Sequence, residues 1–363
     1  MRLLVISHPA VVAANQEVYL ELANRGLEVT IVVPSRWRHE YAADTLVPVP
    51  LPGLEGHLVP LRVALAGKPQ RHFHLAKPGP VLAQTRPDVV FVEAEAFALV
   101  AAQWGVALAA RGIPFGVQAY ENIDRSLPAP VRFLRGAVLS RAAFVAARSE
   151  TAANLALSWG ARGRVALVPP AVPRWEITRE GAPDRPFTIG YAGRLVSEKG
   201  LDDLLEAVRR LDAPVELLLA GDGDQRSALE NQPIPGSRVS LLPGLRHDQM
   251  PDAYARMDVL VLPSRTTARW KEQFGRVIVE ALWCGVPVVG SDSGEIPWLI
   301  GRTGGGVTFP EGNVKALSGR LADLRADADL RARLGSEGRA AVARMFSVAA
   351  AADALQGILD GSG

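Results

Sequence analysis

The sequence contains a single cysteine, Cys284, and so cannot form a disulfide within one chain. This is typical of a protein that works in a reducing compartment. Its 40 basic and 38 acidic side chains nearly balance, so the charge does not indicate a nucleic-acid partner. The 6 histidines lack the clustered spacing of metal ligands, and we therefore expect no bound metal.

Long apolar runs are also missing. No uncharged stretch approaches the roughly 20 residues that a membrane-spanning helix needs. The two longest apolar stretches, 89–110 and 136–147, are interrupted by charged residues such as Glu93 and Arg141. The first apolar run ends at residues 7–9, too early for the core of a secretory signal. We expect a cytoplasmic protein and leave open peripheral contact with the inner face of the cell membrane.

The chain has no glycine-rich turn after its first apolar strand. The segment 9–15 contains no glycine, and Asn15 is expected to cap a helix that runs to Arg25. A dehydrogenase would carry G-x-G-x-x-G at such a turn, and neither half of the chain opens with it. A nicotinamide-dependent enzyme is therefore disfavoured.

Apolar strands alternate with helical segments along the whole chain, which predicts parallel sheets. In the first half we expect strands at 3–6, 27–33, 88–92, 115–119, 142–146 and 165–168, and helices at 15–25, 96–111 and 152–159. After the proline-rich segment 171–187 we expect strands at 188–192, 215–220, 239–242, 259–262 and 286–290, and helices at 201–211, 277–283 and 346–359.

This pattern predicts an α/β fold of two Rossmann-like, doubly wound domains whose strand-end loops face a cleft. We expect a first domain at 1–178, a second domain at 179–345, and a C-terminal helix at 346–363 that packs back on the first domain. Ligands of open parallel sheets bind beyond the carboxyl ends of the strands.

The most informative motif is the segment 271–297, in which Glu280 follows Glu272 by eight residues. Phe274 and Gly275 precede an apolar helix, and the backbone N–H groups at its start are suited to an anion such as a diphosphate. Glu280, in the second turn, can accept hydrogen bonds from the two hydroxyl groups of a ribose. Glu272, in the preceding loop, can accept them from a sugar.

A second motif contains Arg194 and Lys199 in the turn after the first strand of the second half. Negative charge grows on a diphosphate leaving group as its bond to a sugar breaks. Two cations at this position would therefore stabilise the transition state more than the ground state.

Together these motifs resemble the E-x7-E and GR-x5-KG signatures of the family 4 retaining glycosyltransferases, which have the GT-B fold. The resemblance implies that Arg194, Lys199 and Glu272 are catalytic. It also implies that Gly193, Gly221, Arg246, Phe274, Gly275 and Glu280 bind the donor. It further implies that the domain at 1–178 binds the acceptor and the domain at 179–345 binds the nucleotide sugar. The resemblance is specific over roughly 188–310 and general over 1–170.

The resemblance implies a retaining, metal-independent hexosyltransferase that uses a nucleotide-diphosphate sugar as co-substrate and no other cofactor. Asp222 and Asp224 have the spacing of a metal-binding pair, but we interpret them as part of a turn. We favour a UDP- or GDP-hexose donor and a cell-envelope glycan or lipid-linked acceptor. A nucleotide-sugar epimerase of the same fold and a non-catalytic nucleotide-sugar-binding protein stay open as alternatives.

The first half departs from the family pattern. Many relatives carry a His-Asp pair after the strand that corresponds to 115–119, whereas this chain has Glu121 and Asn122 there. We expect His8, Glu121 and Asn122 to contact the acceptor. In the retaining mechanism proposed for this family a leaving phosphate oxygen takes the acceptor proton, so no histidine base is required.

Two basic segments of the first half are interleaved with apolar residues, a pattern that favours contact with an anionic membrane surface. Their basic residues are Arg125, Arg132, Arg135, Arg141 and Arg148 in the first segment, and Arg62, Lys68, Arg71 and Lys77 in the second. The alternative is that both are ordinary solvated surfaces.

Overall fold

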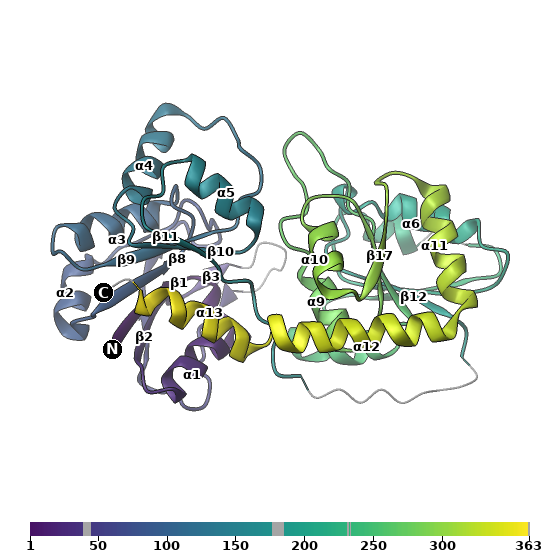
Figure 1. The fold of residues 1–363 in the computed structure, drawn as a ribbon, viewed down its shortest axis with the longest axis horizontal. Coiled ribbons are helices and arrows are strands. Elements are labelled where there is room, and N and C mark those ends of the chain that lie inside the picture. Colours follow the sequence, from purple (N-terminus) through teal and green to yellow (C-terminus); the bar gives the residue numbers. More distant parts are fainter. Residues whose placement is uncertain (39–44, 176–184, 231, 233, 362–363) are drawn as a thin grey trace. The chain divides into compact units, whose positions relative to one another are not determined.

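The computed structural model describes residues 1–38, 45–175, 185–230, 232 and 234–361. The chain divides into two compact α/β units (Figure 1). The first contains Met1–Pro173 together with Val348–Gly363, and the second contains Arg174–Ser347. The domain boundary predicted at residues 178 and 179 lies outside the described residues.

The first unit is built on a seven-stranded parallel sheet with the order β11-β10-β9-β8-β1-β2-β5. Its strands are β1 (Arg2–Ser7), β2 (Glu28–Pro34), β5 (Leu58–Leu61), β8 (Val89–Glu93), β9 (Phe115–Ala119), β10 (Phe144–Ala147) and β11 (Arg164–Leu167). The strand order reverses between β1 and β8, which makes this a doubly wound sheet.

Helices cover both faces of this sheet because successive side chains of a strand point to opposite faces. Leu3 and Val5 belong to the core under α1 (Glu17–Asn24) and α13 (Val348–Asp360), which lie side by side in Figure 1. Leu4 and Ile6 belong to the core on the other face. That face is covered by α2 (Pro78–Thr85), α3 (Leu99–Ala109), α4 (Ala129–Leu139) and α5 (Glu150–Ser158).

The second unit has a six-stranded parallel sheet with the order β14-β13-β12-β15-β16-β17. Its strands are β12 (Thr188–Ala192), β13 (Glu216–Ala220), β14 (Arg238–Leu242), β15 (Val259–Leu262), β16 (Val288–Ser291) and β17 (Gly306–Phe309). Its α-helices are α6 (Leu201–Arg209), α7 (Arg226–Glu230), α8 (Met250–Ala255), α9 (Arg276–Trp283), α10 (Ile296–Thr303), α11 (Val314–Ala326) and α12 (Ala328–Met345). The strand order reverses between β12 and β15.

The two doubly wound sheets match the predicted fold class, but some local predictions were wrong. Asn15 does not cap a helix: its side-chain amide donates to the carbonyl of Pro9, and α1 begins two residues later, after two short 3-10 turns. Two short antiparallel pairs were not predicted, because two residues are too few to show a period. These are β3 (Trp37–Arg38) with β4 (Thr45–Leu46), and β6 (Val63–Ala64) with β7 (Phe73–His74).

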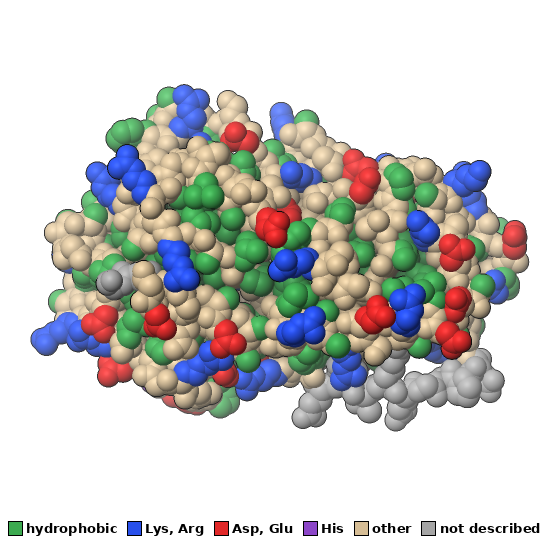
Figure 2. Space-filling model, in the orientation of Figure 1, with side chains coloured by type: hydrophobic (Ala, Val, Ile, Leu, Met, Phe, Trp, Pro, Cys, Tyr) green, Lys and Arg blue, Asp and Glu red, His purple; other side chains and the backbone are tan. Residues whose placement is uncertain are grey.

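Within the described residues, no helix has both the length and the apolar character needed to cross a membrane. On the face drawn in Figure 2, basic and acidic side chains are interspersed rather than gathered into areas of one sign. This distribution agrees with the near balance of charge in the sequence.

Candidate functional site

The loops that follow the strands of the second sheet carry most of the predicted site residues. Gly193 and Arg194 follow β12, Gly221 follows β13, and Glu272 lies in the long loop after β15. The carboxyl ends of parallel strands meet at one edge of a sheet, and this sheet reverses its order between β12 and β15. That reversal is where open sheets of this kind bind ligands.

Two of these turns approach each other so closely that one of them requires glycine. The N–H of Gly193 donates to the carbonyl of Ala220 at 3.0 Å. A Cβ atom at Gly221 would lie 1.8 Å from the carbonyl oxygen of Gly193, so no other residue fits without moving the backbone. Glycine at 221 therefore lets the loops after β12 and β13 pack together.

Lys199 and Glu272, both predicted to be catalytic, are in direct contact. The Lys199 Nζ lies 2.6 Å from the Glu272 Oε2, and both side chains are nearly buried. The buried Ser264 hydroxyl donates to the same Oε2 at 3.0 Å, and the Lys199 Nζ lies 4.9 Å from the centre of the Trp270 ring. A charged pair held by a neutral donor and an aromatic face is positioned rather than loosely solvated.

The end of β16 and the loop that follows it hold Ser264 and Glu272 in place. The N–H of Glu295 donates to the carbonyl of Glu272 at 3.1 Å, and the Ser291 hydroxyl donates to the carbonyl of Ser264 at 2.6 Å. Gly294 has a φ of 56°, and a Cβ there would lie 2.0 Å from the Glu272 carbonyl oxygen. Glycine at this position keeps the two loops in contact.

Glu280 is buried in α9 and is held by three side chains. The Tyr254 hydroxyl donates to its Oε2 at 2.8 Å, the His247 Nε2 lies 3.0 Å from its Oε1, and Arg276 forms an ion pair with it at 2.9 Å. Burial and the neighbouring Glu280 raise the pKa of Tyr254 well above its ordinary value, so the phenol remains a donor. A carboxylate has about four lone-pair sites, so Glu280 retains capacity for a further hydroxyl group.

The remaining predicted donor residues have different surroundings. Gly275, at a φ of 76°, immediately precedes α9, and Phe274 packs edge-on against Phe346 with ring centres 5.9 Å apart. The side chain of Arg246 is exposed and pairs with Asp248 at 2.9 Å. The Arg194 side chain is half-buried, and its carbonyl accepts from the Tyr191 hydroxyl at 2.6 Å.

Several polar residues of this site were not identified as functional from the sequence. From the sequence, no role was predicted for Ser264, His247 or Tyr254. The position of His247, directly after a strand-end turn, is a partial indication of a functional role. Tyr254 had none, because an aromatic residue in a short amphipathic helix is usually part of the core.

Asp222 and Asp224 lie between β13 and α7. No group of three or more potential ligands comes together in the part of the chain that the structure describes. Asp222 instead accepts from the N–H of Gly223 at 2.9 Å and pairs with Arg226. These contacts are those of a turn leading into α7.

In the first unit, His8 is part of a row of rings at the end of β1. Its ring centre lies 4.9 Å from that of Trp37 and 5.2 Å from that of His72, and His74 continues the row to Trp104. Burial and the neighbouring His72 lower the pKa of His8 to about 3, so its ring is neutral near pH 7. Burial, followed by His72, lowers the pKa of His74 to about 4.

The carboxylates at the ends of β8 and β9 are buried and engaged by the protein. Glu93 accepts from the hydroxyl groups of Ser7 at 2.5 Å and Tyr19 at 2.6 Å, and it pairs with Arg148 at 2.9 Å. Glu121 accepts from the N–H of the buried Asn122 at 3.2 Å. Glu121 and Asn122 are thus in contact in the loop after β9, whereas the row of rings that contains His8 lies at the end of β1.

The first basic segment does not form one surface. Arg135 is buried against Trp159, and Arg148 points inward to pair with Glu93. The expectation of membrane contact was therefore wrong for these two residues, because aromatic and carboxylate partners lie against them. Arg125, Arg132 and Arg141 are exposed, as are the four basic residues of the second segment.

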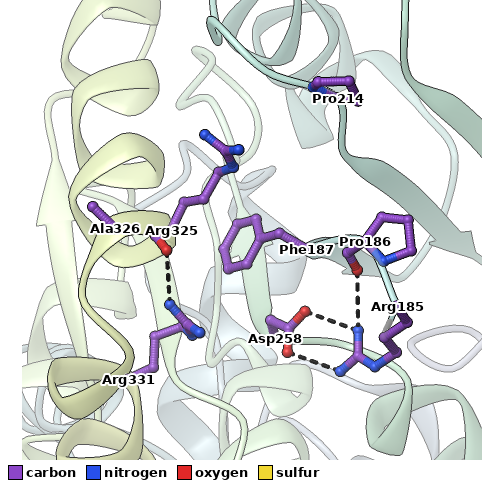
Figure 3. A pocket seen from close by; sticks show the side chains of 8 residues that line it. All are labelled: Arg185, Pro186, Phe187, Pro214, Asp258, Arg325, Ala326 and Arg331. Carbon is purple, nitrogen blue, oxygen red and sulfur yellow. Dashed lines mark hydrogen bonds and ion pairs between the residues drawn. The ribbon is translucent and has the colours of Figure 1, made fainter. Parts of the chain in front are cut away.

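A separate pocket of about 620 Å³ opens near the amino ends of β12 and β15 (Figure 3). Arg185 makes two hydrogen bonds of 2.8 Å to the carboxylate of Asp258, and the Arg331 guanidinium lies 5.2 Å from the Phe187 ring centre. This pocket flanks the opposite edge of the sheet from Glu272 and Glu280. It plays no part in the candidate site.

Comparison with known families matches both halves of the chain. The model for group 1 glycosyl transferases matches residues 174–341, and the model for the glycosyl transferase 4-like domain matches residues 10–171. One curated relative is a GDP-mannose-dependent monoacylated alpha-(1-6)-phosphatidylinositol monomannoside mannosyltransferase of Corynebacterium glutamicum. It is 32% identical over 185 residues, which are 49% of this chain and 48% of the relative. The chain spans about half the length of the curated relatives it matches.

Solved structures share the fold over nearly the whole chain. Sucrose-phosphate synthase from Thermosynechococcus elongatus superposes with a TM-score of 0.74 at 18% identity, covering 99% of this chain and 98% of that one. Anabaena HepE in complex with UDP-glucose superposes with a TM-score of 0.68 at 18% identity, covering 99% of each chain. At these identities the likeness concerns the fold alone.

Proposed function

Because the chain belongs to the group 1 glycosyltransferases of the GT-B fold, we propose that it transfers a hexose from a nucleotide-diphosphate donor to a hydroxyl group, with retention of configuration. The observation that carries this proposal is the contact between Lys199 and Glu272 at the carboxyl edge of the second sheet. One residue of each signature motif contributes to that contact, although they lie 73 positions apart.

Lys199 and Arg194 would neutralise the diphosphate. The backbone at Gly275, which leads into α9, offers N–H groups to the same phosphates. Lys199 already pairs with Glu272, so an incoming diphosphate would share this cation with the carboxylate. As the bond from sugar to phosphate breaks, the growing negative charge would strengthen the contacts with both cations.

Glu272 and Glu280 would orient the two ends of the donor. Glu272, fixed by Ser264 and by the backbone of Glu295, would accept hydrogen bonds from hydroxyl groups of the sugar. Glu280, fixed by Tyr254, would accept from the ribose. A leaving phosphate oxygen on the same face as the acceptor would take the acceptor proton while the new bond forms. This mechanism retains the configuration and needs neither a metal ion nor a separate base.

The substrates proposed are a UDP- or GDP-hexose and a cell-envelope glycan or lipid-linked acceptor. The Corynebacterium relative is GDP-mannose-dependent and is named for a phosphatidylinositol mannoside acceptor, and HepE was solved with UDP-glucose. These two proteins support the donor classes without distinguishing between them. His8, Glu121 and Asn122 at strand ends of the first sheet are proposed to contact the acceptor.

Thermal-shift measurements with UDP, GDP, ADP and their common sugar conjugates should identify one stabilising nucleotide. A ligand at 100 times its Kd would stabilise the folded state by about 2.7 kcal/mol. Glu280→Gln keeps an acceptor oxygen for Tyr254 but removes the charge, and it should abolish most of the shift. Glu337→Gln, at an exposed carboxylate of α12, is the matched control. An undiminished shift in Glu280→Gln would remove Glu280 from the donor site.

We also propose that the first unit contacts an anionic membrane surface. Phe133 of α4 is 80% exposed and stands beside the exposed Arg132, as expected of a helix that lies on lipid. The full chain should cosediment with phosphatidylglycerol-containing vesicles at low salt and dissociate as salt is raised. Phe133→Ser with Arg132→Gln should weaken this binding at least several-fold. Equal binding by the variant, or none by the unmodified protein, would refute the proposal.

A further inference from the structure

A small pocket in the first unit is lined by side chains from separate segments. Its walls include Glu121 and Arg125 from the loop after β9, Arg135 of α4, and Trp159, which follows α5. The cavity volume is about 50 Å³. This is room for on the order of four water molecules, and therefore for a group with the size of a carboxylate or a phosphate.

Arg135 is the unusual member of this pocket. Its side chain is nine-tenths buried, and its guanidinium lies 4.0 Å from the centre of the Trp159 ring. The Nε and Nη1 atoms have no hydrogen-bond partner among the described residues. A guanidinium stays charged in proteins, and the aromatic face offsets only part of the cost of burying it. Unmet donors on a buried cation are expensive, and an anionic ligand would satisfy them.

The charges around the pocket leave one positive charge unbalanced. The Arg125 Nε pairs with the Glu121 Oε2 at 3.2 Å, so these two lining residues neutralise each other and Arg135 is in excess. Outside the lining, Asp124 accepts from the Trp159 Nε1 at 2.8 Å, and its charge attracts Arg135 while that of Arg132 repels it. The lining therefore complements a single negative charge.

The buried carboxyl group of Glu95 also attracts the Arg135 guanidinium. Glu95 accepts from the N–H groups of Tyr120 and Glu121, both at 2.7 Å. Burial raises the pKa of Glu95 to about 7, so near neutral pH it carries only part of a charge. Glu95 attracts Arg135 but makes no hydrogen bond to it, so the Nε and Nη1 donors of the guanidinium have no partner among the described residues.

We propose that this pocket binds one anionic oxygen group, a phosphate or a carboxylate, carried by the acceptor. The assignment to the acceptor rests on the proposed function. The pocket is formed in part by the loop after β9, at the carboxyl edge of the first sheet, where doubly wound sheets bind ligands. Arg135 would donate to the anion from Nε and Nη1, while Trp159 holds the guanidinium plane in place.

The test is calorimetric titration of the full chain with methyl phosphate and, separately, acetate at constant ionic strength. Arg194→Ala serves as the parent protein, because the proposed donor site would also attract phosphate. The parent should bind one of the two probes saturably, and the preferred probe identifies the oxyanion. Adding Arg135→Gln should weaken binding on the order of tenfold or more. Adding Arg111→Gln, at an exposed arginine of the same unit that does not line the pocket, should leave it unchanged.

Thermal unfolding with and without the bound probe separates a ligand site from a structural role. The probe should stabilise the parent and fail to stabilise the Arg135→Gln variant. Arg135→Lys, which keeps the charge but not the planar fork, should give an intermediate shift. Binding of equal strength with and without Arg135, or no saturable binding of either probe to the parent, overturns the proposal. Nucleotide binding, measured with Arg194 intact, tests the proposed function separately and should survive Arg135→Gln.

Discussion

Replacing Glu272 with alanine should lower kcat on the order of 100-fold or more, because the sugar would lose the group that orients its reacting carbon. The fixed position of the carboxylate, between Lys199 and the Ser264 hydroxyl, is what makes the expected effect large. The measurement is product formation with the donor identified by thermal shift. Arg194→Ala should cause a loss of similar size.

Two further variants divide this effect into parts. Glu272→Gln removes the charge but keeps an acceptor oxygen for Ser264 and Lys199, so comparing it with Glu272→Ala separates the loss of the charge from the loss of the whole group. Ser264→Ala removes a positioning contact, and it should reduce kcat by less than either change at Glu272. Glu337→Ala on α12 should be silent. A Glu272→Ala protein with near-normal kcat would exclude Glu272 from the reaction.

Acidification from pH 6.5 to 4.5 should destabilise the first unit by about 1.4 kcal/mol per pH unit. The folded-state pKa values of His8 and His74 are lowered to about 3 and about 4, so in this range the unfolded chain binds two protons that the folded chain does not. Each histidine therefore stabilises the fold above pH 6.5 and progressively less below it.

Glu95 acts in the opposite direction. Its folded-state pKa is raised to about 7, above the ordinary 4.5, so between these values the folded chain binds a proton that the unfolded chain does not. Stability from Glu95 therefore increases as the pH falls. As the pH falls, His8 and His74 each lower the stability of the fold and Glu95 raises it, so the net loss of stability is that of one titrating group. The lowered pKa of His72 adds to this loss.

Hydrogen exchange of the β8 and β9 amides, compared at pH 6.5 and pH 4.5 after correction for intrinsic rates, would measure this loss locally. His8→Phe keeps a ring against Trp37 and should reduce the acid sensitivity by about half or more. His57→Gln, at a histidine bonded to the carbonyl of Val29 outside the row of rings, is the matched control. Protection of the first unit that is equal at the two pH values would contradict the assignment.

The sequence predicted the two sheets well because strands depend on local patterns. Apolar runs indicated the strands, and the polar residues directly after them indicated the candidate site. Contacts between distant turns could not be predicted: no local period connects Lys199 with Glu272, or His8 with His72. The burial of Arg135 was also missed, since arginine in a helix is usually exposed and only the fold shows that Trp159 lies against it.

Because α13 belongs to the first unit, it determines the order in which the two units can fold during synthesis. Leu355 and Ile358 contribute to the same core as Leu3 and Val5, although the whole second unit is synthesised between them. The second unit is continuous in sequence and can complete its core first. The first unit must wait with an uncovered apolar face until residues 348–360 have emerged from the ribosome. During synthesis, the part of the protein that begins first is therefore the part that is finished last.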